Sequence, residues 1–274
     1  MNIMQNKIFD IAQTFANLCQ KYNLQYFLCG GTVLGAVRHH GFIPWDDDMD
    51  FLMPREDYEK FLQIAPKELE NTHYALRDFS VDGEGYSFCF SKIDDRTTTL
   101  IELSQSNFGS KAGVYIDIFP LDGTFDSKLS QTCHLFIISK LIRLREIAFT
   151  ARIRKSKPIR NLLIKILQKT CRGKTLHSLI SFCLTLKPYR YSNFAGNLVW
   201  GYGIKEVMPK DIFGSGRTIS FEGTEFTAPN QTDLYLRRLY EDYMTYPPEE
   251  ERVSQHPVFF MDLDLPYKDY QYDL

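Results

Sequence analysis

The stretch CGGTVLGAVRHHGFIPWDDDMDFLMP, residues 29–54, combines a glycine pair, a short apolar segment and four aspartates beside one tryptophan. The segment YFLCGG (26–31) predicts a buried strand that ends in a glycine turn. Residues 32–40 predict a short helix, and DMDFLMP (48–54) predicts a second strand that Pro54 ends. Together these elements predict an α/β (α+β) fold.

Further elements are expected on both sides of this stretch. Apolar residues at helical spacing predict one helix over residues 6–22 and another over residues 56–69. Residues 128–187 are expected to be helical. The remaining predicted elements are strands at 73–79, 86–93, 97–103 and 113–123, short strands within 216–229, and a helix at 232–244.

The composition limits the class of protein. With 274 residues, of which 44% are hydrophobic and 24% charged, the chain can bury a sizeable core. The 32 basic and 34 acidic residues nearly balance, so there is no overall attraction to nucleic acid. Asp10 interrupts the apolar part of the N-terminal segment, which argues against a signal peptide, and no stretch reaches the ~20 apolar residues of a membrane span. The six cysteines contain no CxxC pair, so we expect a cytoplasmic protein without disulfides.

The charge is unevenly distributed. Residues 140–174 contain twelve Lys or Arg and one acid, whereas residues 241–274 contain nine acids. The segment ARIRKSKPIRNLLIKILQKTCRGK (151–174) places apolar residues, among them Leu162 and Ile166, on one side of a basic helix. This pattern predicts contact with an anionic membrane surface, and the alternative is a helical insertion packed on the core. Phe149 is the only aromatic residue within 140–174, which argues against nucleic-acid binding.

Three aspartates form a candidate metal site. Asp48 and Asp50 lie two residues apart in a predicted strand, so both side chains should point to one face. Two carboxylates on one face suit a hard cation such as Mg²⁺ or Mn²⁺. Asp117, in a separate predicted strand, could supply a third carboxylate, or it could be a core acid paired with an arginine.

The glycine turn is a candidate phosphate site. Gly30, Gly31 and Thr32 lie where a strand passes into a helix, and backbone N–H groups and the helix dipole favour phosphate there. A plain tight turn is the alternative. Combined with the carboxylates, the turn indicates transfer of a group from a nucleotide-activated phosphate.

The same segment resembles a known family. GGTVLGAVRHHGFIPWDDDMDFLMPREDYEKF (30–61) is similar to the signature of the LicD family, bacterial phosphocholine transferases related to the fukutin-type enzymes that transfer polyol phosphates to glycans. The order of the glycine pair, Asp-x-Asp and a later strand aspartate resembles the nucleotidyltransferase superfold. The similarity continues in IDIFPLDG (116–123) and in residues 221–252, and it leaves out the basic middle of the chain.

The resemblance implies a nucleotidyltransferase-like mixed sheet, a divalent metal (Mg²⁺ or Mn²⁺), a CDP-alcohol donor such as CDP-choline, and a glycan or lipid-linked oligosaccharide acceptor. Position by position, Asp48 and Asp50 match the metal-binding pair of the family. Asp117 matches the third acid, either as a metal ligand or as the base that takes the acceptor proton. Gly30, Gly31 and Thr32 match the donor-phosphate turn.

Other residues are weaker candidates for donor binding. Arg38 and Lys92 could each reach a phosphate oxygen, although Arg38 could equally be a surface residue. Trp45 adjoins the aspartates and could form part of an aromatic cage for a quaternary ammonium group. Other aromatic candidates for this cage are Trp200, Tyr202, Tyr243 and Tyr86. Residues regarded as ordinary turn or loop positions, or as still weaker candidates, are Asp46, Asp47, His39, His40, Glu222 and His256.

We therefore expect a catalytic core over residues 1–125, a helical basic insertion over 126–190, and a C-terminal part over 191–274 that completes the acceptor side. The expected reaction is metal-dependent transfer of phosphocholine, or a similar phospho-alcohol, from a CDP donor to a sugar hydroxyl, with CMP leaving. One alternative is nucleotidyl transfer from an NTP to a small acceptor. Another is a non-catalytic glycan- or lipid-binding protein on the same fold, which the presence of all three carboxylates disfavours.

Overall fold

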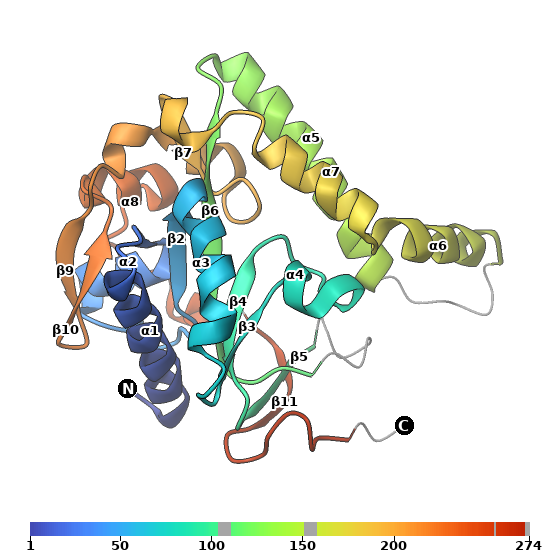
Figure 1. Ribbon diagram of the computed structural model, residues 1–274. Helices are drawn as coiled ribbons and strands as arrows, with labels where there is room; N and C mark the ends of the chain where they lie inside the picture. The colour runs from blue at the N-terminus through green and yellow to red at the C-terminus, as the bar shows by residue number, and fades with distance from the viewer. Residues whose placement is uncertain (104–110, 151–157, 255, 272–274) are drawn as a thin grey trace.

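Two parallel strands, β2 (Asp50–Pro54) and β6 (Tyr115–Thr124), lie at the centre of a mixed sheet (Figure 1). The computed structural model describes residues 1–103, 111–150, 158–254 and 256–271. The sheet has the strand order β1-β2-β6-β4-β3, and its other pairs are antiparallel. The edge strands of this order are β1 (Phe27–Leu28) and β3 (Tyr74–Arg77), and β4 (Ser91–Asp95) lies between β6 and β3. The expected mixed α/β sheet is confirmed.

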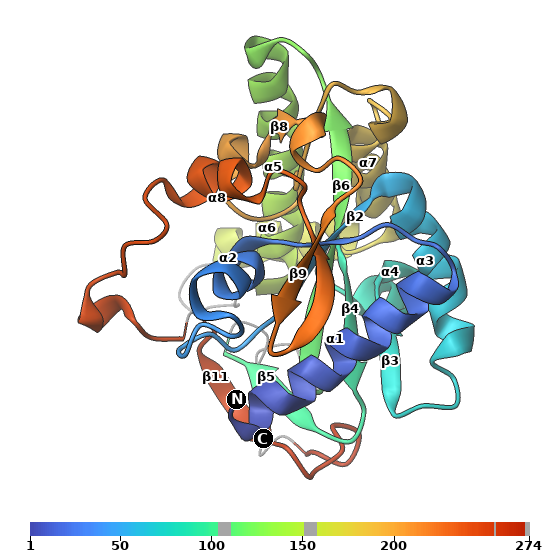
Figure 2. The same ribbon diagram turned by 90° about the vertical axis from the view of Figure 1, so that its left-hand side faces the viewer.

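The last third of the chain adds strands to this sheet and around it. β7 (Phe194–Gly196) pairs with the end of β6, and β8 (Met208–Pro209) pairs with β7. β9 (Arg217–Phe221) and β10 (Thr224–Ala228) form a hairpin that packs beside helix α2 (Gly30–His39) and strand β1 (Figure 2). β11 (Val258–Asp262) pairs with β5 (Thr99–Glu102). The segment before β11 thereby reaches residues 46–50, which we call the acidic stretch: His256 Nδ1 lies 2.9 Å from Asp47 Oδ1.

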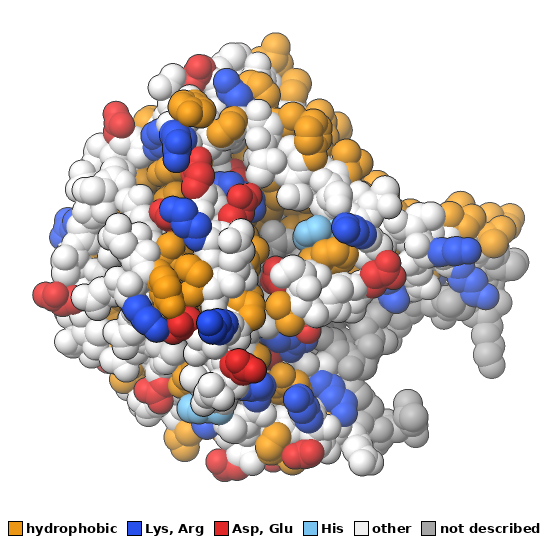
Figure 3. Space-filling view, viewed as in Figure 1, with side chains coloured by type: hydrophobic (Ala, Val, Ile, Leu, Met, Phe, Trp, Pro, Cys, Tyr) orange, Lys and Arg blue, Asp and Glu red, His pale blue; other side chains and the backbone are white. Residues whose placement is uncertain are grey.

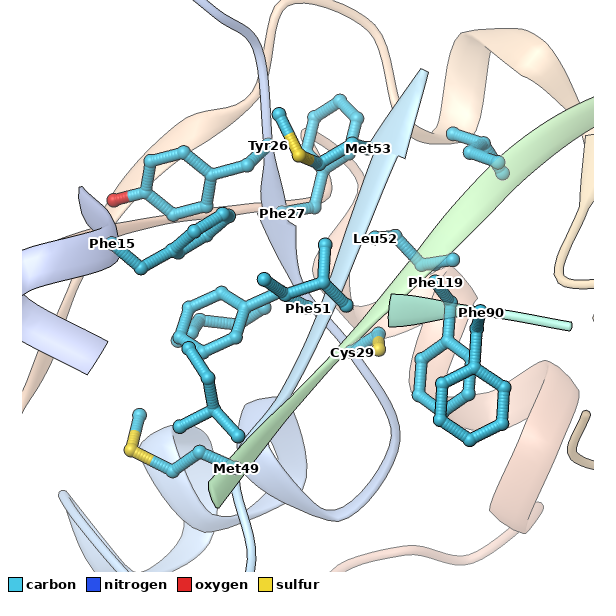
Figure 4. Close-up of a cluster of buried hydrophobic side chains, with 14 of the residues drawn as sticks. Phe15, Tyr26, Phe27, Cys29, Met49, Phe51, Leu52, Met53, Phe90 and Phe119 are labelled. Carbon is cyan, nitrogen blue, oxygen red and sulfur yellow. The ribbon is translucent and has the colours of Figure 1, made fainter. Parts of the chain in front are cut away.

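Helix α1 (Ile3–Lys21) covers one face of the sheet. It begins with a capping box, in which the Asn2 side chain accepts the Gln5 N–H and the Gln5 side chain accepts the Asn2 N–H. Phe15 of α1 packs against Phe51 with ring centroids 4.7 Å apart, and Phe90 and Phe119 pack together on the other side of β2 (Figure 4). Truncating a buried aromatic ring such as Phe15 to alanine costs about 3–5 kcal/mol, so this cluster holds the strands that carry the site.

Three helices form an arm that leaves the sheet after β6. We call α5 (Lys128–Thr150), α6 (Pro158–Cys171) and α7 (Lys174–Leu184) the helical arm. α6 packs on α5 and α7 and extends away from the body of the molecule (Figure 1). The helical prediction for 128–187 is therefore confirmed over most of the described residues from 128 to 184, and residues 151–157 lie outside the described part. The division of the chain into three domains stays a prediction.

Most predicted elements are present, with shifted ends. The remaining helices are α2 (Gly30–His39), α3 (Arg55–Glu68), the short α4 (Phe79–Asp82) and α8 (Thr232–Tyr240). The strand predicted at 86–93 is wrong in its first half, because β4 begins at Ser91. The helix predicted to reach residue 244 ends at Tyr240, because Glu241 adopts a positive φ of 60° that cannot continue an α-helix.

Candidate active site

The predicted acidic residues converge at the start of the central strand pair. The register of the parallel pair places Asp50 beside Asp117, and Asp48 lies two residues before β2 begins. The prediction that Asp48 itself lies in the strand is therefore wrong, although Met49 still accepts the Asp117 N–H through its carbonyl. On the other side of β6, Lys92 of β4 stands opposite Asp117, and its Nζ lies 2.6 Å from Asp117 Oδ1.

Two adjoining cavities open onto these residues. The larger has a volume of about 1430 Å³, and its wall includes the glycine turn, Arg38, Trp45 and the acidic stretch. The smaller, of about 260 Å³, is lined by Lys92 and Asp117 among others. Asp48 and Asp50 line both cavities. Eight of the nine predicted site residues thus line one or both of these cavities, and the ninth, Thr32, is buried.

The glycine turn is packed directly against the aspartates. Gly30 adopts a φ of +53°, and a Cβ at this position would lie 3.2 Å from Asp50 Oδ2. A Cβ at Gly31 would lie 2.7 Å from Asp46 Oδ2, too close for a side chain. The absence of side chains therefore lets the backbone approach the carboxylates.

Most hydrogen-bonding groups of the turn already have protein partners. The Gly30 N–H donates to the Tyr235 hydroxyl (3.1 Å), and the Thr32 N–H donates to the Cys29 carbonyl (3.1 Å). The Thr32 hydroxyl accepts the Asp50 N–H at 2.8 Å. Thr32 thus fixes the start of β2 relative to α2, and the role of the turn in holding a donor phosphate stays a prediction.

The acidic stretch and Asp117 together contain more carboxyl groups than the two nearby cations, Lys92 and His256, can neutralise. Burial raises the pKa of Asp50 well above its ordinary value, and the neighbouring charges of Asp48 and Asp117 raise it further. Burial, followed by the charge of Asp48, raises the pKa of Asp46 to about 8. The pKa of Asp117 is about 6, because burial raises it while the Lys92 ammonium opposes the rise. A bound cation would relieve this repulsion.

Sequence reasoning ranked His256 too low. His256 Nδ1 lies 2.9 Å from Asp47 Oδ1, and Nε2 lies 3.7 Å from Asp48 Oδ2. The hydrogen bond to Asp47 raises the pKa of His256 to about 9, so it supplies a positive charge beside Asp48 at neutral pH. Ser254 donates a second hydrogen bond to Asp47 at 2.6 Å. A separation of 208 residues between His256 and Asp48 left no local pattern that could have revealed this contact.

Arg38 and Trp45 belong to one cluster of two arginines and two aromatic rings. The Arg38 guanidinium lies 4.8 Å from the ring centroid of Tyr246, and Arg252 lies 5.8 Å from the ring centroid of Trp45. Arg38 also donates a hydrogen bond to the Tyr243 carbonyl at 2.9 Å. We call Arg38, Trp45, Tyr246 and Arg252 the arginine cluster. Its charge is positive, which suits an anionic part of a ligand.

The carboxylates of the acidic stretch are of the type that binds a divalent cation. Their oxygens are hard ligands, and their raised pKa values indicate that positive charge is missing. In the described parts of the chain, no three side chains of His, Cys, Asp or Glu are already arranged around one point as a set that could hold a metal. Asp48 and Asp50 remain the best placed pair, because both line the two cavities.

Comparison with known proteins identifies the family. The lipopolysaccharide cholinephosphotransferase LicD of Haemophilus influenzae is 30% identical over 251 residues, which cover 90% of this chain and 92% of that protein. The chain belongs to the LicD family. The profile of the family, described as LicD/FKTN/FKRP, nucleotidyltransferase domain, matches residues 23–137. This matched region of the LicD family contains Asp48, Asp50, Lys92 and Asp117.

More distant relatives share part of the chain. The human ribitol 5-phosphate transferase FKRP is 27% identical over 111 residues, 40% of this chain and 19% of FKRP. An uncharacterised protein of Rickettsia typhi is 42% identical over 60 residues, 22% of this chain and 19% of that protein. Among the described residues of this LicD-family chain, no helix has both the length and the apolar character needed to cross a bilayer.

Proposed function

We propose that this protein transfers a phospho-alcohol, phosphocholine or a close analogue, from a CDP-activated donor to a hydroxyl group of a glycan or lipid-linked oligosaccharide. The relative that matches almost the whole chain is a cholinephosphotransferase, and a partial relative is a ribitol 5-phosphate transferase. The single observation that carries the proposal is the convergence of Asp48, Asp50 and Asp117 on one cleft. A transferase that acts on charged phosphates needs carboxylates at this place, because they hold the divalent metal that neutralises the phosphate oxygens.

In the proposed reaction the acceptor oxygen attacks the phosphorus atom that carries the alcohol. A new P–O bond forms, the P–O bond to CMP breaks, and its electron pair leaves with CMP. Asp48 and Asp50 would hold a divalent metal, which neutralises phosphate oxygens when it is bound. Asp117 would take the proton of the acceptor hydroxyl, since a carboxylate whose pKa is about 6 is ionised at neutral pH and still basic enough to accept it.

CMP release tests this proposal directly. Purified protein with Mg²⁺ and an oligosaccharide acceptor is incubated with CDP-choline, CDP-ethanolamine, CDP-glycerol or CDP-ribitol, and CMP is measured. We expect the wild type to release CMP from at least one donor. The Asp50→Asn variant should release none, and the control variant Asp10→Asn, at an exposed position, should release CMP as the wild type does. Pyrophosphate release from CTP without CMP release would instead establish nucleotidyl transfer.

We also propose that the helical arm contacts anionic lipid. Four apolar side chains of α6 are at least half exposed, namely Ile159 (78%), Leu162 (60%), Leu163 (57%) and Ile166 (50%). Apolar side chains also stand along the edge of the helical arm (Figure 3). Phe182 of α7 is 62% exposed, and Phe136 of α5, which lines the large cavity, is 60% exposed. Exposed Lys165 and Lys169 lie on the same helix α6. Apolar contact combined with positive charge suits the surface of an anionic bilayer. The sequence-based candidates Arg152, Arg154, Lys155 and Lys157 lie outside the described residues.

A further inference from the structure

One buried acid in the large cavity has no role in the proposed transfer. Glu206 lines the cavity and is 5% exposed. Its described contact is a 3.3 Å hydrogen bond that it accepts from the Tyr202 N–H, and no Lys, Arg or His of the described residues lies within 4.0 Å to form an ion pair with it. Burial raises the pKa of Glu206 to about 7, and the hydrogen bond from Tyr202 opposes the rise. Without a cation beside it, this acid holds a proton more readily than an exposed glutamate does, and a cationic ligand in the cavity would favour its charged form.

Aromatic rings stand around this acid. Tyr202 and Tyr240 are packed edge to face with centroids 5.3 Å apart, and Trp200 lines the same cavity. Tyr202 is 51% exposed and Trp200 is 54% exposed, so their rings are accessible from the cavity. We call Trp200, Tyr202, Glu206 and Tyr240 the acidic aromatic wall. Rings combined with one carboxylate form the type of surface that recognises organic cations.

The wall lies next to the acidic stretch. The Tyr240 hydroxyl is 3.8 Å from the position that a Cβ on Gly30 would occupy, and Asp50 Oδ2 is 3.2 Å from the same position. Burial raises the pKa of Tyr202 and Tyr235, and the nearby charges of Glu206 and Asp50 raise it further. If a cation at Asp50 bound a donor phosphate, a short substituent on that phosphate could reach the wall.

The two aromatic groups of the cavity differ in charge. In the arginine cluster, the rings of Trp45 and Tyr246 already have guanidinium groups over them. A second cation placed on these rings would meet like charge. The acidic aromatic wall instead carries a carboxyl group that has no basic partner among the described side chains, and a cation bound there would favour the charged form of this group.

We propose that the acidic aromatic wall binds the positively charged head group of the donor alcohol, a quaternary or primary ammonium, and that the arginine cluster receives the nucleotide part. This inference rests on the proposed function and adds the residues that select the alcohol. It assigns the cation to Tyr202, Tyr240 and Glu206, and it removes Trp45 from the ammonium cage that the sequence suggested.

The test compares a charged and an uncharged alcohol in the Glu206→Gln variant. Glutamine keeps the oxygen that accepts the Tyr202 N–H, so the local turn is retained while the charge is lost. Dissociation constants for CDP-choline and CDP-ribitol are measured by calorimetry in wild type and variant. We define the preference as the ratio of the dissociation constants of CDP-ribitol and CDP-choline. We expect this ratio to fall by about tenfold or more in the variant, which is the usual contribution of one charged contact. Tyr202→Leu should reduce the same preference, and Trp45→Leu should weaken both donors to a similar extent.

A second measurement keeps the inference separate from the proposed reaction. Choline and its uncharged isostere 3,3-dimethyl-1-butanol are titrated against wild type and Glu206→Gln without any nucleotide. If the wild type binds choline without a nucleotide and the variant binds it more weakly, the acidic aromatic wall is the ammonium site, even if no CDP-alcohol is turned over. If CMP is released from CDP-choline but Glu206→Gln changes both donors equally, the assignment of the wall is wrong and the proposed function stands.

Discussion

The Lys92 ammonium nitrogen lies 2.6 Å from Oδ1 of Asp117, and the register of β4 and β6 places the two residues directly opposite each other. Lys92 Nζ also lies 3.4 Å from the ring centroid of Tyr115. The lysine is 6% exposed. Its charge is therefore held in the interior by one carboxylate and by aromatic rings, and this pairing sets the charge balance of the smaller cavity.

Breaking this pair should cost stability as well as activity. Lys92→Met leaves Asp117 without its cation, and loss of one partner of a buried ion pair costs about 3–5 kcal/mol. Urea unfolding should show this loss. The double variant Lys92→Met/Asp117→Asn removes both charges and should recover most of the stability, but not the CMP release. A double variant as unstable as Lys92→Met would contradict the pairing.

The Asp50→Asn variant should be more stable than the wild type but much less active. Removing one charge relieves repulsion from Asp48 and Asp117, so the melting temperature without divalent metal should rise above that of the wild type. CMP release should fall by about 100-fold or more, since even outer-shell residues of metal sites contribute 10–100-fold. Mg²⁺ or Mn²⁺ should stabilise the wild type in a thermal-shift assay and the variant much less. Equal metal shifts in both proteins would refute the assignment of Asp50 as a ligand.

Gly31→Ala should impair the site with little effect on the fold. Its Cβ would lie 2.7 Å from Asp46 Oδ2, so the Asp46 carboxylate, which lines the large cavity, must shift. Displacement of about 1 Å near reacting groups can cost about 100-fold in rate. Helix propensity favours alanine over glycine by about 1 kcal/mol, which should offset part of the strain. Gly85→Ala is the matched control, because no atom lies within 4 Å of its Cβ position. Full activity in Gly31→Ala would show that the acidic stretch tolerates displacement.

The α6 surface should bind anionic vesicles. The double variant Leu162→Gln/Ile166→Gln removes two exposed aliphatic side chains, each worth about 1.5–3 kcal/mol when it is fully buried. Sedimentation with phosphatidylglycerol vesicles should show strong loss of binding relative to wild type. Leu234→Gln on α8, where the leucine is 50% exposed, is the control and should bind as wild type does. Lys165→Gln/Lys169→Gln should weaken binding mainly at low salt. Equal sedimentation of all variants would leave α6 as an ordinary helical insertion.

His177 should make the helical arm sensitive to acid. Its ring stacks on Phe79 with centroids 3.9 Å apart, and burial, aided by the charge of Arg145, lowers its pKa to about 4. The unfolded chain has a histidine pKa of about 6.5. Between these values the unfolded state binds more protons, so the stabilising contribution is present above pH 6.5 and is lost as the pH falls toward 4.

His177→Phe keeps an aromatic ring on Phe79 but cannot take up a proton. Melting temperatures of wild type and variant at pH 7.5 and pH 5 provide the measurement. The wild type should lose more thermal stability between the two values than the variant. Parallel losses would show that other groups account for the acid sensitivity.

Local patterns in the sequence predicted much of the fold. Apolar residues at period 3.6 predicted α1 and α3, and the β-branched and aromatic run at 113–123 predicted β6. These signals are reliable because side-chain periodicity depends on neighbouring residues alone. The acidic stretch and the glycine turn were recognised for the same reason, since strand, turn and carboxylates are contiguous in the chain.

Tertiary packing decided which side chains meet. The pairing of Asp50 with Asp117 depends on the register of two strands that are separated by 60 residues between their ends. Likewise, His256 reaches Asp47 because β11 returns to β5. Register and burial result from long-range packing, which no local pattern encodes. The sequence by itself determined the elements and the acidic stretch of the site, whereas the partners of those acids, and the unpaired Glu206 among the described residues, were decided only when distant segments packed together.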